Sequence, residues 1–167
     1  MFKQHRDHMR APTKPAADEA FTDKHGRLIE VSDDEAAEVK QLGYHKLIGC
    51  LLWPARNCYL AISYAVTELS RCVERPGLKA WQSALHTLHY LYMIRHDGIG
   101  YNSDEPEEIV CYYDSGHMQD RHDYRSQYGY VITMFGGPIL WQSKKHQHVG
   151  ESAAEDEYMA LNHAHKQ

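Results

Sequence analysis

The pattern of hydrophobic and polar positions divides the chain into a helical part and a strand-rich part. From residue 32 to residue 97, apolar side chains recur at every third or fourth position, which is the period of an amphipathic α-helix. Four helices are predicted in this part, at residues 33–41, 44–52, 60–73 and 80–95. The fourth is the clearest, with a predicted core stripe of Trp81, Ala84, Leu85, Leu88, Leu91 and Tyr92.

Local signals set the expected ends of these helices. Ser32 followed by Glu35 is a capping-box pattern, so the first helix should begin at Asp33. Gly43 should end it, because glycine readily adopts the left-handed conformation that follows many helices. Pro54 should interrupt the second helix, because proline lacks the N–H that a helix interior needs.

After Gly98 the period of the pattern changes. Three segments rich in β-branched and aromatic residues predict short strands, at residues 109–114, 128–135 and 139–145, with a Gly-Gly-Pro turn before the third. Helical spacing returns after Ser152. Helices, a meander of three strands and a final helix form the order of an α+β fold.

Composition and charge limit the class of protein. The length of 167 residues suits one domain with or without a tail, and the polar residues 1–31 predict a disordered segment or tether. A formal charge of -5 argues against a strongly basic nucleic-acid binder, but not against a nucleic-acid enzyme that binds metal ions. Four scattered cysteines and no membrane-length apolar run predict a reduced intracellular compartment, cytoplasmic or else nuclear or particle-associated, without a membrane partner.

Two carboxylates are candidate metal ligands. Ser152 and Glu155 form a second capping box, and helical spacing then places Glu157 on the apolar face that should lie on the sheet. A buried carboxylate is costly unless a cation compensates it. Asp114 ends the first strand, so the two side chains could meet at Mg²⁺ or Mn²⁺. The alternative is that Glu157 favours the helix dipole and Asp114 begins a turn.

The histidines and tryptophans could also bind ligands, but we interpret them as surface or core residues. The thirteen histidines include the spaced pairs His86/His89, His146/His148 and His163/His165, which show no recognised zinc spacing and are interpreted as surface residues. The three tryptophans could stack on nucleic-acid bases, but core packing is expected for Trp53, Trp81 and Trp141.

The order of several phrases resembles copia-type LTR retrotransposon Pol polyproteins. YHKLIGCLLW (residues 44–53), ISYAVTELSR (62–71), Trp81 and Tyr90-Leu91 resemble the connection region that follows reverse transcriptase. Later phrases resemble the ribonuclease H domain of that family: Asp114, Asp120, Asp123, Arg125-Ser126 and Gly129-Tyr130-Val131 its first hairpin, GPILWQSKK (137–145) its third strand, and EDEYMAL (155–161) its first helix. The match begins near Tyr44 and continues to the last residues.

The resemblance implies an architecture and a chemistry. Residues 32–97 would be a helical connection region, and residues 98–167 a truncated ribonuclease H-like domain with a three-stranded antiparallel meander and its first helix. Asp114 would be the first catalytic metal ligand and Glu157 the second. Enzymes of this family use two divalent ions, Mg²⁺ or Mn²⁺, to cut the RNA strand of an RNA–DNA hybrid. The implied partners are such a hybrid, the rest of the polyprotein, or a second copy of the chain.

Departures from the family pattern change the expected activity. The family's third and fourth metal ligands have no counterpart before Gln167, and basic residues of the fourth helix are replaced near Leu85, His86 and His89. We therefore expect a catalytically inactive fragment in which Asp114 and Glu157 are traces of a metal site. Two alternatives remain: a hybrid ribonuclease completed by another chain, and a nucleic-acid-binding or assembly module.

Overall fold

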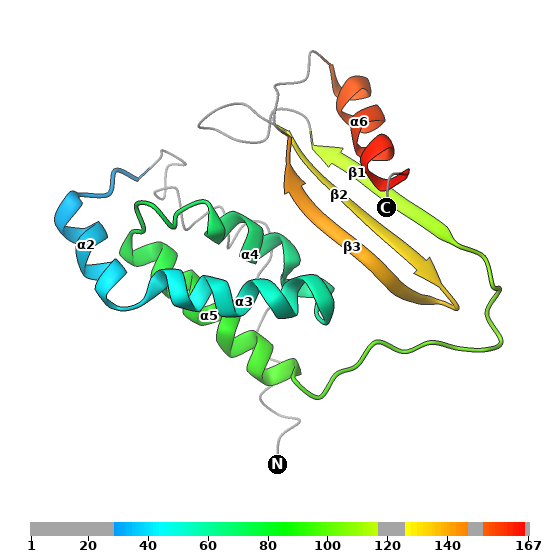
Figure 1. Cartoon of the computed structure of the whole chain (residues 1–167), viewed down its shortest axis with the longest axis horizontal. Helices are drawn as coiled ribbons and strands as arrows, with labels where there is room; N and C mark the ends of the chain where they lie inside the picture. The colour runs from blue at the N-terminus through cyan, green and yellow to red at the C-terminus, as the bar shows by residue number, and fades with distance from the viewer. Residues whose placement is uncertain (1–28, 117–125, 147–151, 166–167) are drawn as a thin grey trace. The chain divides into compact units, whose positions relative to one another are not determined.

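The computed structural model describes residues 29–116, 126–146 and 152–165, and it divides into two units that meet in the sequence at Gly98 and Ile99 (Figure 1). Of the predicted tether, only residues 29–31 lie within this range. The described residues form an α+β arrangement, with helices in the first unit and a three-stranded sheet with one helix in the second. None of the described helices is both long enough and apolar enough to span a bilayer.

Helix α2 (Asp33–Gln41) begins as predicted. The Oγ of Ser32 accepts a hydrogen bond from the N–H of Glu35 at 3.2 Å, and Gly43 follows the helix with a φ of 93°. The carboxylate of Glu35, however, accepts a hydrogen bond from the N–H of Leu78 at 2.7 Å. Leu78 opens α5, whose N-cap is Gly77 with no side chain to offer, so α2 caps the start of another helix.

Helix α3 (Tyr44–Asn57) continues through Pro54, so the predicted interruption is wrong. Proline removes one helical hydrogen bond and costs about 3 kcal/mol in a helix interior. The chain tolerates this cost because Leu51 and Ala55, on either side of the proline, are both buried in the core. The carbonyl of Pro54 accepts hydrogen bonds from the N–H groups of Cys58 at 2.9 Å and Tyr59 at 2.8 Å, and these bonds close the helix.

The next two helices differ from the prediction in their bounds or in their buried face. A 3₁₀ turn (η2, Leu60–Ile62) precedes α4 (Ser63–Ser70), which is therefore shorter than the predicted helix. Helix α5 (Leu78–Ile94) buries Ala80, Ala84 and Thr87. It exposes three members of its predicted core stripe, which are Leu85, Leu88 and Tyr92.

The core of the helical unit forms around Tyr44. This side chain is fully buried with Val39, Ile48, Leu69, Ala80 and Ala84, and a second cluster of Leu51, Ala55, Ile62 and Val66 continues the core along α3 and α4. The Oη of Tyr44 donates a hydrogen bond to the carbonyl of Leu69 at 2.8 Å. This bond satisfies a polar group that would otherwise be buried without a partner.

The second unit contains the predicted antiparallel meander. Strands β1 (Val110–Gly116), β2 (Gln127–Met134) and β3 (Gly137–Lys145) lie in the order β1-β2-β3. Helix α6 (Ala153–His165) packs on β1 and β2, and Ala160 contacts Tyr128 and Tyr130. The Oγ of Ser152 accepts the N–H of Glu155 at 3.2 Å, as the capping-box pattern predicts.

The turn between β2 and β3 is displaced from the predicted Gly-Gly-Pro. Its two central residues are Phe135 and Gly136, with φ values of 51° and 72°, which is the sign pattern of a type I′ hairpin turn. Gly137 and Pro138 belong to β3. Gly137 is required because a Cβ there would lie 2.5 Å from the carbonyl oxygen of Gly100. The segment before β1 therefore packs directly on the start of β3.

We predict that Glu35→Ala destabilises the helical unit by about 1 kcal/mol, because the N–H of Leu78 loses its acceptor. Urea unfolding followed by circular dichroism at 222 nm measures the change. Glu35→Gln keeps an acceptor oxygen and should recover part of the loss. Glu38→Ala, an exposed glutamate on the same helix, is the control and should stay within about 0.5 kcal/mol of wild type. Equal effects of Glu35→Ala and Glu38→Ala would contradict the capping role.

A second prediction concerns Cys72. Burial raises the pKa of its thiol from 9.0 to about 12, with Arg71 opposing the shift and Glu68 adding to it. In the unfolded chain the thiol loses its proton near pH 9, so between these values the unfolded state binds fewer protons and the free energy of unfolding falls as pH rises. Below the unfolded pKa this group adds no pH dependence.

Thiol alkylation checks this environment. At pH 8, iodoacetamide should modify the exposed Cys50 and Cys111 within minutes, whereas the partly buried Cys72 should react much more slowly until urea unfolds the chain. Mass spectrometry of the alkylated peptides identifies each site. Equal rates at Cys72 and Cys50 in the folded protein would show that the thiol is not buried as described.

Candidate functional site

Asp114 lies on the face of the sheet that α6 does not cover. It pairs with Gly129 of β2, and directly opposed residues in an antiparallel pair point to the same face. Tyr128 and Tyr130, which flank Gly129, point to the other face and pack against Ala160 of α6. The carboxylate of Asp114 is exposed. The pleat of the sheet therefore separates Asp114 from the helix that carries Glu157.

The predicted inward orientation of Glu157 is wrong. Its side chain is exposed, as are Ala154 and Leu161 of the face that was expected to lie on the sheet. Ala160 is fully buried instead, because its small side chain lets the helix approach the two tyrosine rings. Glu157 lies three residues earlier, which places it about 60° round the helix from this contact.

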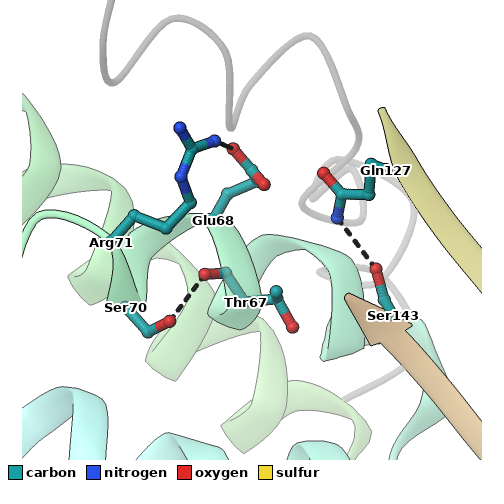
Figure 2. A network of polar contacts seen from close by, with 6 residues as sticks. All are labelled: Thr67, Glu68, Ser70, Arg71, Gln127 and Ser143. Carbon is teal, nitrogen blue, oxygen red and sulfur yellow. Dashed lines mark hydrogen bonds and ion pairs between the residues drawn. The ribbon is translucent and has the colours of Figure 1, made fainter. Parts of the chain in front are cut away.

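The residues near Asp114 do not fit a two-ion centre. Among the side chains that the structure describes, no group of three or more metal-binding residues comes together. The row across the sheet from Asp114 is Gly129 and then Ser143. Ser143 accepts a hydrogen bond from the side-chain amide of Gln127 at 3.0 Å (Figure 2). A carboxylate partner for Asp114 is not among these neighbours.

The buried carboxylate of the described chain belongs to Glu68 of α4. It is only 4% exposed and forms an ion pair with the guanidinium of Arg71 at 2.7 Å (Figure 2). The spacing Glu-x-x-Arg, one helical turn apart within an apolar helix, was the sequence signal for it. Arg71, whose side chain is 32% exposed, compensates the charge of this carboxylate, which would be costly to bury without a partner.

A small polar cluster closes one end of the sheet. The His146 ring packs on the ring of Tyr128 with centroids 4.5 Å apart, and its Nε2 lies 3.4 Å from the Oγ of Ser115. The N–H of His146 donates to the carbonyl of Ser126 at 2.8 Å. His146 is therefore buried, contrary to its interpretation as a surface residue, whereas His148 lies outside the described residues.

Helix α3 presents an exposed face that combines basic and aromatic side chains. Trp53 is 66% exposed, so the expectation of core packing is wrong for this residue. It lies nine residues after the buried Tyr44, which is half a turn away at about 100° per residue. The other members of this α3 face, all exposed, are His45, Lys46, Gly49, Cys50, Arg56 and Asn57.

The α3 face has the chemistry of a nucleic-acid contact. No Asp or Glu lies between Tyr44 and Asn57, so Lys46 and Arg56 are not neutralised from their own helix. Gly49 has open space where a side chain would be, which lets a ligand approach the helix backbone. The spacing could have revealed this face, since Trp53 falls opposite the apolar stripe. Trp141 is buried and Trp81 packs against the core, as expected.

Comparison with known proteins finds relatives among transposon proteins and one effector. Secreted RxLR effector protein 161 of Plasmopara viticola is 30% identical over 126 residues, covering 75% of this chain and 89% of that protein. The retrovirus-related Pol polyprotein from transposon TNT 1-94 of Nicotiana tabacum is 29% identical over 141 residues, covering 84% of this chain. The putative transposon Ty5-1 protein of Saccharomyces cerevisiae is 34% identical over 102 residues, 61% of this chain.

The share of each relative that is covered differs widely. The chain spans 10% of the TNT 1-94 polyprotein and 33% of the Ty5-1 protein, against 89% of the Plasmopara protein. No family model matches the chain. No solved structure matches it either. Similarity to a short segment of long polyproteins is thus combined with similarity to nearly all of a much shorter protein.

Proposed function

This chain belongs to the family of retrotransposon Pol polyproteins, and from that premise we propose that it is a copia-type fragment that binds nucleic acid rather than cutting it. The fragment would combine the region after reverse transcriptase with the front of a ribonuclease H-like domain. The observation that carries the proposal is the α3 face, where Trp53 stands exposed between Lys46 and Arg56. Its ligand would be an RNA–DNA hybrid, the substrate class that the resemblance implies.

The dimensions of the α3 face suit one strand of a duplex. Lys46 and Arg56 are ten residues apart, which is about 15 Å along a helix. Basic side chains at that separation can each neutralise a phosphate of the same backbone. Between them, Gly49 admits close approach and the Trp53 ring offers a flat apolar surface for a sugar or base. The charge of -5 on the whole chain predicts weak binding, and two phosphate contacts predict a modest dependence of the affinity on salt.

The positions of the Asp114 and Glu157 carboxylates favour binding over cleavage in this proposal. Hydrolysis by two metal ions needs several carboxylates around a pair of ions about 4 Å apart. Asp114 points to the face of the sheet opposite α6, and Glu157 is exposed on that helix. Completion of the site by a second polypeptide is the enzymatic alternative, and it would appear as activity only in a mixture.

A second candidate function is that of an assembly module that acts without nucleic acid. The observation that favours it is the Plasmopara relative, 89% of which is covered by the match, so a related sequence makes up most of a much shorter protein. That relative is named a secreted effector. In such a module the exposed Trp53 would contact a protein, and nucleic acid would not compete for it.

We predict no carboxylate-dependent cleavage. A labelled RNA–DNA hybrid incubated with the purified chain in Mn²⁺ should be cut no faster than with the double variant Asp114→Asn, Glu157→Gln, because the two side chains do not share a site. Gel analysis of the labelled strand measures the rates. If the wild-type chain cuts the hybrid and the double variant does not, the non-catalytic proposal is wrong.

We predict that Trp53→Ala weakens binding of the hybrid about tenfold, in line with about 1–3 kcal/mol for a stacked base. Lys46→Glu with Arg56→Glu should weaken it further and lower the salt dependence by about two phosphate contacts. Fluorescence anisotropy of a labelled hybrid at several salt concentrations measures both. Trp53→Phe should bind nearly as well as wild type.

The control is Lys40→Glu at an exposed position of α2, measured beside the single variant Lys46→Glu, which makes the same charge change on α3. Lys40→Glu should alter affinity less than threefold. If Lys40→Glu weakens binding as much as Lys46→Glu does, overall charge rather than the α3 face governs the interaction. If Trp53→Ala has no effect, the face is not the binding site and the assembly module becomes the better explanation.

A further inference from the structure

Gly49 is a glycine that the fold of the helical unit does not require. It lies in the interior of α3, where glycine lowers helix stability relative to alanine because it loses more conformational freedom on folding. Its φ is not in the left-handed region, and an added Cβ would meet no atom of the described residues within 4 Å. Neither backbone conformation nor packing therefore explains this glycine. The role that remains is close approach of a ligand to the helix backbone.

The open space at Gly49 borders the exposed Trp53 ring. Gly49 precedes Trp53 by four residues, which places it one turn earlier and about 40° round the helix. Side chains on a helix lean toward its N-terminus, so Trp53 leans toward the turn that contains Gly49. The ring nevertheless leaves the space open, because none of its atoms comes within 4 Å of the added Cβ. An aromatic ring that is 66% exposed thus stands beside helix surface that has no side chain.

The charged groups of the α3 face lie on the same side of the helix as this space. Lys46 and Arg56 are exposed and lie about 20° and 60° from Trp53 round the helix. Neither forms an ion pair with a residue that the structure describes. The side-chain amide of Asn57 donates to the carbonyl of Trp53 at 2.8 Å, which holds a polar group one turn after the ring. A nucleic-acid strand along α3 would meet one cation before the ring and one after it.

We propose that the open space at Gly49 receives an unpaired base of the bound nucleic acid, stacked on the Trp53 ring, an inference that rests on the function proposed for the α3 face. Inside a duplex the neighbouring bases cover both faces of each base, so stacking on a protein ring requires a base that has left the stack or lies beyond it. The favoured ligand is therefore an RNA–DNA hybrid with a single-stranded extension. Gly49 determines this preference, because a side chain there would occupy the space that the base needs.

Three fluorescein-labelled hybrids that share one duplex test this preference on the full chain. The first is blunt, the second carries a single-stranded extension of about four nucleotides, and the third carries the same extension with abasic sites in place of its bases. The two extensions have equal numbers of phosphates, so only the bases differ. Anisotropy should show that the wild-type chain binds the extension with bases about tenfold more tightly than the abasic one.

Two matched glycine variants locate the base. Gly49→Leu should abolish the preference for the extension with bases, and it should change the affinity for the blunt hybrid by less than about twofold, because Lys46 and Arg56 stay in place. Leucine is a better helix former than glycine, so the Tm of the chain should not fall. Gly98→Leu makes the same change at an exposed glycine outside α3, where an added Cβ also meets no described atom within 4 Å. It should keep the preference.

Cysteine alkylation locates the base without any variant. Cys50 is exposed next to Gly49 on the α3 face, whereas Cys111 is exposed in the second unit. The hybrid with the base-bearing extension, added to saturation, should slow the reaction of iodoacetamide with Cys50 severalfold and leave Cys111 unchanged. The abasic hybrid at the same occupancy should protect Cys50 less. Equal protection of Cys50 by the two hybrids would contradict a base at this position.

The binding data separate this inference from the function on which it rests. If the wild-type chain binds the extensions with and without bases equally well, the inference is wrong and the function proposed for the α3 face stands. If Gly49→Leu weakens the blunt hybrid as much as the extended one, Gly49 contacts the sugar-phosphate backbone and the inference is again wrong. If the wild-type chain binds none of the three hybrids, the proposed function itself fails, and the stacked base fails with it.

Discussion

The burial of Tyr44 is the constraint on which the helical unit depends. Its ring occupies the centre of a cluster from α2, α3, α4 and α5, and its hydroxyl needs a partner there because an unsatisfied buried polar group costs about 1–3 kcal/mol. The carbonyl of Leu69 provides that partner near the end of α4. One bond therefore sets the rotation of α3 and its register against α4. With Tyr44 turned inward, Trp53 is turned outward half a turn away.

The same core decides how α5 lies. Helices approach closely where their facing residues are small, and α5 offers Ala80, Ala84 and Thr87 to the core around Tyr44. The capping of Leu78 by Glu35 holds the first turn of α5 against α2. Because the side of α5 that carries small residues faces the core, its bulky residues lie on the outer side of the helix. The exposed α3 face and the exposed side chains of Leu85, Leu88 and Tyr92 on α5 thus both follow from the packing of the helical unit.

In the sheet, the alternation of side chains between the two faces determines which residues contact α6. Pairing of Asp114 with Gly129 and of Tyr113 with Tyr130 sends Asp114 and these two tyrosines to opposite faces. Ala160 can then lie close to the two tyrosines of β2, which fixes the side of α6 that contacts the sheet. In this register Asp114 lies on the face of the sheet opposite the contact between Ala160 and the two tyrosines, and Glu157 is exposed on α6. Membership of the Pol family and the local geometry of these two carboxylates are therefore separate findings, and a cleavage function does not follow from membership.

Much of the fold was determined by the sequence, because capping residues, periods and turn residues act over a few neighbouring positions. Ser32, Ser152 and the alternating strands predicted the helix starts and the antiparallel meander correctly. The faces were decided by tertiary structure. The spacing of apolar residues in the sequence shows which of them share one face of a helix. Where apolar residues cover more than half of the helix surface, as in α5, the packing of neighbouring elements determines which of them are buried. That is why Glu157, Trp53 and Leu85 face solvent, why Pro54 is tolerated, and why the Glu35 carboxylate caps a helix 43 residues away.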